Sequence, residues 1–94
     1  MSTQEIILNI AVNLGRLGRW AHEKKYKRIP QFIDDNEYYL NLLSQTKKST
    51  KIQPTLDSFI KNYNLRISDK NYSDAWAEFM FTWSNILTHR SKIA

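Results

Sequence analysis

The sequence predicts an all-α fold: a small antiparallel bundle of about four helices with an aromatic core. Apolar residues recur every three or four positions in four segments, and no segment shows the sustained alternation of a β-strand. Glycine and proline are scarce, with two of each, which disfavours a turn-rich β-sandwich or barrel. The connections between the segments are short, and short connections make neighbouring helices run in opposite directions. Two long helices braced by two short ones would satisfy the same pattern.

The first helix is predicted to begin at Ser2 or Thr3 and to run to about Tyr26. Glu5 follows Ser2 at the spacing of a capping box, in which each residue satisfies a free backbone N–H of the other. One face of this helix is apolar and consists of Ile7, Ile10, Leu14, Leu17 and Ala21.

The other three helices are predicted from their start signals. Pro30 suits the first turn of a second helix, and Pro54 suits the start of a third. Ser73 is the expected N-cap of the fourth helix, while the polar run at 44–51 is the expected loop between the second and third. The apolar faces are Ile29, Phe32, Ile33, Leu40 and Leu43; then Leu56, Phe59, Ile60 and Tyr63; then Tyr72, Trp76, Phe79, Met80, Trp83 and Leu87.

The length of 94 residues predicts a single domain over 1–94, because the chain can bury one modest core. Cysteine is absent, which excludes a disulfide framework, a thiolate nucleophile and a thiolate metal site. The N-terminal apolar run carries Glu5 and two asparagines and lacks a positive leader, so it is not expected to be a signal peptide. We expect a cytoplasmic protein with no membrane partner.

A stripe of small residues crosses the first helix. Ala11, Gly15, Gly18 and His22 are spaced four, three and four apart and therefore share one edge of the helix. Each glycine costs a helix about 1 kcal/mol relative to alanine. The stripe predicts close packing against the fourth helix, whose Trp76 and Trp83 need room; the alternative is a groove for a ligand beside His22.

Positive charge is concentrated at the end of the first helix. The net charge is +5, and the segment from Arg16 to Arg28 holds six cationic residues against Glu23, which alone gives +5. A smaller basic group lies at Lys47, Lys48 and Lys51. Local basicity of this kind is what an anionic partner would encounter.

Trp20 lies within this basic segment and off the apolar face of its helix, with Arg16 and Lys24 one turn away on either side. An exposed indole among cations suits stacking on a nucleic-acid base, with the cations on phosphates. It equally suits a protein interface, where tryptophan and arginine are enriched. A third interpretation is that the indole folds back over the edge of the bundle beneath an arginine.

The spacing of Arg16 and His22, with five residues between them, loosely resembles the arginine-to-histidine spacing of the HEPN ribonucleases, which are also helical bundles. The resemblance covers two residues, and it implies RNA cleavage with His22 as a catalytic residue. In that family the motif lies at the start of a late helix, whereas here it lies inside the first. We therefore expect no catalytic residue here.

No metal or cofactor site is expected either, because His22 and His89 would lie at opposite ends of an antiparallel helix pair. Asp74 and Glu78 are four residues apart and are expected within reach of Arg19 or His22 as surface ion pairs. Asp34, Asp35 and Glu37 open the second helix, where negative charge complements the helix dipole.

The function predicted from the sequence is a non-catalytic protein-interaction or regulatory module. Its expected contact surface is Arg16, Arg19, Trp20, Lys24, Lys27 and Arg28. A weak, salt-sensitive nucleic-acid binder using the cations of the same surface is the alternative, and an RNase-like enzyme comes third. Leu42 and Phe81 fall off the apolar faces, which predicts a self-association surface and a homodimer.

Overall fold

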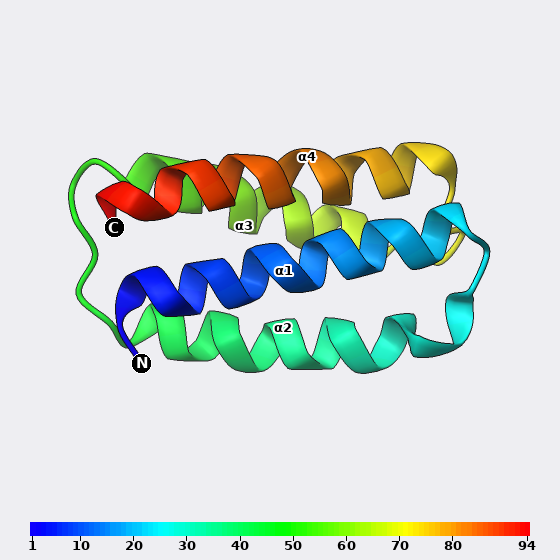
Figure 1. Cartoon of the computed structure of the whole chain (residues 1–94), viewed down its shortest axis with the longest axis horizontal. Helices are drawn as coiled ribbons and strands as arrows, with labels where there is room; N and C mark the ends of the chain where they lie inside the picture. The colour runs from blue at the N-terminus through cyan, green and yellow to red at the C-terminus, as the bar shows by residue number, and fades with distance from the viewer.

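The computed structural model describes residues 1–94 and confirms the all-α prediction. Four helices make up most of the chain: α1 (Thr3–His22), α2 (Ile29–Ser44), α3 (Gln53–Ile67) and α4 (Asp74–Arg90). Two 3-10 turns, η1 (Tyr26–Arg28) and η2 (Ser91–Ile93), precede α2 and follow α4. Consecutive helices run in opposite directions, so the molecule is an antiparallel bundle with both termini at one end (Figure 1).

Two helix starts predicted from the sequence are confirmed. At α1 the Ser2 hydroxyl accepts the Glu5 N–H at 3.1 Å, and the Glu5 carboxylate accepts the Ser2 N–H at 3.0 Å. The Ser2 backbone N–H that bonds to the carboxylate is the main cause, and the Ser2 side chain a lesser one, of a Glu5 pKa below its ordinary value. At α4 the Ser73 hydroxyl accepts the Trp76 N–H at 3.2 Å. Both serines satisfy backbone donors that a helix start leaves free.

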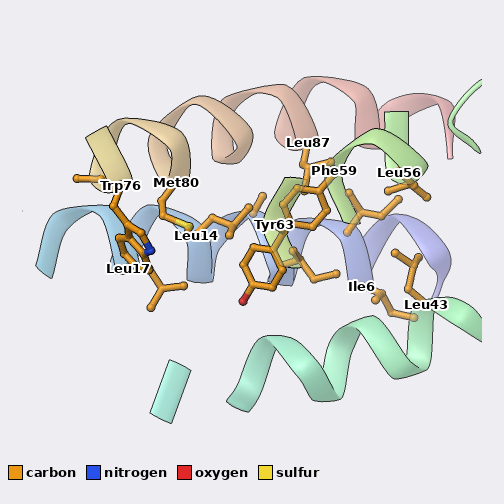
Figure 2. Close-up of a cluster of buried hydrophobic side chains, with 14 of the residues drawn as sticks. Ile6, Leu14, Leu17, Leu43, Leu56, Phe59, Tyr63, Trp76, Met80 and Leu87 are labelled. Carbon is orange, nitrogen blue, oxygen red and sulfur yellow. The ribbon is translucent and has the colours of Figure 1, made fainter. Parts of the chain in front are cut away.

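Helix α1 is the central element of the core. Every residue of its predicted apolar face is buried. Side chains from α3 and α4 meet those of α1 in the middle of the bundle (Figure 2). The largest fully buried side chains of the protein are Phe59, Tyr63 and Trp76, which confirms the aromatic core. The Phe59 ring lies 5.2 Å from that of Tyr63 and 5.3 Å from that of Trp83, within the range of favourable aromatic pairs.

The small-residue stripe of α1 faces α4, as predicted, but it does so against different residues. A methyl group on Gly18 would lie 2.9 Å from the Phe81 ring and 3.1 Å from the Ala77 carbonyl oxygen. A methyl group on Gly15 would lie 3.4 Å from the Ser84 hydroxyl. The glycines therefore make room for Phe81 and for the backbone of α4, and not for Trp76 and Trp83.

A polar pair is buried between α2 and α3. Asn36 and Tyr63 are both fully buried, and neither the Asn36 carboxamide nor the Tyr63 hydroxyl has a hydrogen-bond partner. Burial raises the pKa of Tyr63 to about 12. This pair was not anticipated from the sequence, because the helical pattern marks Asn36 as an ordinary polar position.

Candidate functional site

The structure forms a hollow at the junction of α1 and α2. Its volume is about 340 Å³, and its lining residues are Trp20, Lys25, Lys27 and Arg28. Three of these four belong to the contact surface predicted from the sequence. We call the four residues the basic pocket.

The end of α1 sets the position of Lys25. The helix ends at His22 and not near Tyr26, because Lys24 adopts the left-handed conformation with φ of 59°. Lys24 donates its N–H to the Ala21 carbonyl at 3.2 Å, and Lys25 donates to the Trp20 carbonyl at 2.7 Å. These two bonds form a Schellman motif, which turns the chain sharply at a helix C-terminus. Lys25 is thereby fixed beside Trp20.

The same turn explains why the contact surface predicted from the sequence contains Lys24 and lacks Lys25. A helix continued to Tyr26 would place Lys24 one turn beyond Trp20, on the same face. The Schellman motif instead leaves Lys24 outside the pocket lining and brings Lys25 in. Glycine is the usual residue at this left-handed position, so its absence removed the one sequence signal that predicts such an ending.

Lys27 and Arg28 are positioned by the short η1 turn and by the residues on either side of them. Ile29, directly after Arg28, is fully buried in the core. The Tyr26 ring, directly before Lys27, lies 5.6 Å from the ring of Tyr72, which precedes α4. One end of the turn is therefore anchored in the core, the other contacts Tyr72 through an exposed ring, and the two cationic side chains are exposed between them.

Trp20 is half-buried and is not the free indole that an exposed stacking surface would have. Its ring meets the Phe32 ring of α2 edge-on, with 4.7 Å between centroids and 60° between the planes. The Arg16 guanidinium lies over the same Phe32 ring at 5.6 Å. The indole therefore folds against the bundle edge, as one interpretation predicted, although the arginine covers Phe32 instead of Trp20. The rest of the indole forms one wall of the basic pocket.

The charges of the pocket are only partly neutralised within the protein. Lys25 pairs with Glu23 at 3.3 Å, and both side chains are well exposed. Lys27 and Arg28 form no ion pair, and the other three cations of the predicted surface, Arg16, Arg19 and Lys24, are also exposed without one. The pocket can therefore offer two unpaired positive charges beside an aromatic wall.

The structure does not bring Arg16 and His22 together. Arg16 turns towards α2, whereas His22 faces α4, where its Nδ1 lies 3.9 Å from Asp74 Oδ1. Both members of this pair are largely exposed, as the sequence predicted for a surface ion pair. No group of three or more His, Cys, Asp or Glu side chains is placed to hold a metal ion.

Leu42 and Phe81 differ from their expected exposure. Both are half-buried and pack against the protein's own core, and Phe81 occupies the space that Gly18 leaves. The most exposed large apolar side chains are instead Leu65, Met1, Tyr38 and Val12. A second and smaller hollow of about 50 Å³ lies between α2 and α3 and includes Leu40, Leu56 and Ile60.

The fold and the pocket together define the class of this protein as a small four-helix bundle with a basic pocket at one end. No family model, curated protein or solved structure matches the chain. None of its helices combines the length and the apolar character required to cross a membrane.

Proposed function

We propose that this protein is a non-catalytic interaction module that binds an acidic segment of another protein through the basic pocket. The observation that carries the proposal is the convergence of Trp20, Lys27 and Arg28 on one hollow with unpaired positive charge. Tryptophan and arginine are the residues most enriched among those that dominate binding energy at protein interfaces. Lys27 and Arg28 attract the anionic segment, and the indole supplies apolar contact area.

The distribution of charge favours a short anionic segment over a nucleic-acid strand. A strand needs a groove of positive charge that follows its backbone over several nucleotides. Here the second basic group, at Lys47, Lys48 and Lys51, lies in the loop between α2 and α3, at the opposite end of a molecule 37 Å long (Figure 1). The two groups therefore do not form one continuous surface.

Nucleic-acid binding is the second candidate, because an indole beside cations also suits a base and its phosphate. In that case Arg16, Arg19 and Lys24 would add contacts around the pocket. A cytoplasmic setting belongs to the main proposal and stays a prediction. Homodimerisation through Leu42 and Phe81 is not included, since both side chains are half-buried against the protein's own core.

Site-specific photo-crosslinking in the native cell tests the proposal. A benzophenone side chain at position 25, an exposed residue of the pocket lining, reports what contacts the pocket. We expect a crosslinked protein that survives nuclease treatment. The double substitution Lys27→Glu and Arg28→Glu should abolish it, whereas Lys47→Glu and Lys51→Glu, with the same change of charge at the far end, should not.

Two results would overturn the proposal. A crosslink that nuclease removes would favour the nucleic-acid candidate. A protein crosslink that is equally strong in both double variants would show that the pocket does not make the contact.

A further inference from the structure

The basic pocket joins two kinds of wall that suit different parts of one ligand. Trp20 offers the surface of an indole that Phe32 leaves free, and Lys27 and Arg28 offer positive charge within the same 340 Å³ hollow. Pockets for small ligands measure roughly 300–1,000 Å³, so this one suits a single ring with one attached group. A single aspartate or glutamate side chain would use the cations and leave the indole to another residue of the bound segment.

The charge of the pocket fits a dianion better than a carboxylate. The lining carries three cations, and Glu23 pairs with one of them, Lys25, at 3.3 Å. Two positive charges remain, on Lys27 and Arg28. A phosphate monoester carries about −1.5 to −2 charges at neutral pH and has three acceptor oxygens for such donors. Arginine in particular binds phosphate through two parallel N–H groups.

The backbone that carries these groups is held in place before any ligand arrives. The Schellman motif ties Lys25 to Trp20, while buried Ile29 and the Tyr26–Tyr72 contact hold the two ends of the η1 turn. Fixing the backbone in advance reduces the entropy that binding has to overcome. The long side chains then need only to settle on the anion.

We propose that the basic pocket binds an aromatic ring that carries a phosphate group, with the ring against Trp20 and the phosphate between Lys27 and Arg28. This inference rests on the proposed function, since it names the chemistry that the pocket selects. Phosphotyrosine in a partner protein is the source that agrees with that function. A nucleoside monophosphate is the other source of the same chemistry, so the experiment includes both.

Titrations followed by ¹H–¹⁵N NMR test the two halves of the ligand separately. The probes are phenyl phosphate, inorganic phosphate and benzoate. Phenyl phosphate should shift the indole N–H of Trp20 and the amides of residues 25–28. Inorganic phosphate and benzoate should each bind about tenfold more weakly, because one lacks the ring contact and the other lacks the second charge and third oxygen.

Variants assign the two contacts to residues. Arg28→Gln and Lys27→Gln should each weaken phenyl phosphate binding about tenfold, the effect of one charge-assisted hydrogen bond. The control Lys51→Gln, which removes the same charge at the far end of the bundle, should leave it unchanged. Trp20→Leu should weaken the binding of phenyl phosphate but not that of inorganic phosphate. Trp20→Phe should restore the preference for phenyl phosphate over inorganic phosphate. Unchanged phosphate binding in Trp20→Leu also shows that the variant is folded.

The source of the ring is resolved by comparing a phosphotyrosine peptide with its phosphoserine and unphosphorylated forms, and with uridine monophosphate. Preference for phosphotyrosine supports the inference and the proposed function together. Preference for the nucleotide supports the pocket chemistry and contradicts the protein source. If phenyl phosphate binds no better than inorganic phosphate, or no better than benzoate, the inference is wrong. The crosslinked protein partner would be unaffected by that result, so the two proposals can fail separately.

Discussion

Lys24 is the residue whose backbone conformation matters most at the pocket, because it adopts the left-handed region without being glycine. That conformation costs a residue with a Cβ atom about 1 kcal/mol relative to glycine. We therefore expect Lys24→Gly to raise the free energy of unfolding by about 1 kcal/mol, measured by urea denaturation. Lys24→Ala is the matched control, since it removes the same charge and keeps the Cβ atom. Equal stabilisation by both variants would assign the effect to charge.

Tyr63 makes stability depend on pH in the alkaline range. Its pKa is about 12 in the folded protein, against an ordinary value of 10. Between these values the unfolded chain loses the phenolic proton while the folded chain keeps it, so stability falls as pH rises. Ionisation of Tyr63 leaves the free energy of unfolding unchanged below about pH 10. By about pH 12 it has lowered that free energy by about 2 kcal/mol.

Comparison with Tyr63→Phe isolates this contribution from the other groups that titrate in the same range. Removing a hydroxyl without a hydrogen-bond partner should leave stability at pH 7 unchanged or slightly higher. From pH 10 upwards the wild-type protein should lose stability faster than the variant, as followed by thermal unfolding. Curves that stay parallel would mean that the phenol ionises as easily in the folded state as in the unfolded chain.

Single residues also show where prediction from sequence works and where it stops. Three of the four pocket residues were predicted, because local charge and position on a helical wheel can be obtained from the sequence itself. Contacts with other helices could not be obtained in this way. The pairing of Arg16 with Phe32 and the cover that Phe32 gives to Trp20 depend on how α2 lies along α1.

Helix α1 offers a matched pair of substitutions at its contact with α4. Gly15→Ala places a methyl group at ordinary contact distance from Ser84, 3.4 Å, so the better helix propensity of alanine should raise stability by about 0.5–1 kcal/mol. Gly18→Ala places it 3.1 Å from the Ala77 backbone oxygen and 2.9 Å from Phe81. The helices would have to separate, and overpacking of this kind costs about 1–3 kcal/mol.

Thermal and urea unfolding of the two alanine variants measure this difference directly. The expected result is opposite signs for two substitutions that are chemically identical and one turn apart. Stabilisation by Gly18→Ala would mean that the close contact of α1 with α4 is not required.

The starts of helices were predicted better than their ends. Ser2 and Ser73 were identified because an N-cap serine bonds to the backbone within three residues, which is a local feature of the sequence. The end of α1 was placed four residues too late, because the Schellman motif there uses lysine where glycine is usual. Prediction therefore succeeded where the stabilising contact was local and used a residue typical of it.

At the scale of the whole molecule, the antiparallel order of the helices was predictable from the lengths of the connections, whereas the exposure of Leu42 and Phe81 was not. A helical wheel assigns α4 a single apolar face, and Phe81 falls outside that face. In the bundle α4 also contacts α1, and the space left by Gly18 accommodates the ring. Exposure depends on all the helices that surround a residue, and one helix pattern contains only part of that information.

The placement of the positive charge has a consequence for the stability of the whole bundle. Lys27 lies in the turn directly before α2, close to Arg28 and to the positive end of the α2 dipole, and it has no ion pair. Positive charge near a helix N-terminus is unfavourable by about 0.3–1 kcal/mol at low salt. Lys27→Gln should therefore raise the free energy of unfolding by a few tenths of a kcal/mol or more, measured by urea denaturation in 10 mM salt. The gain should shrink at 150 mM salt, where the screening length is about 8 Å.

Lys61→Gln, also exposed but in the middle of α3, should change stability little in either condition. If Lys27→Gln stabilises the fold and weakens phenyl phosphate binding, this lysine lowers stability in the free protein and becomes favourable only when an anion occupies the pocket. If it destabilises the fold at low salt, its charge already has a partner within the protein, and the electrostatic basis of the proposed site is wrong.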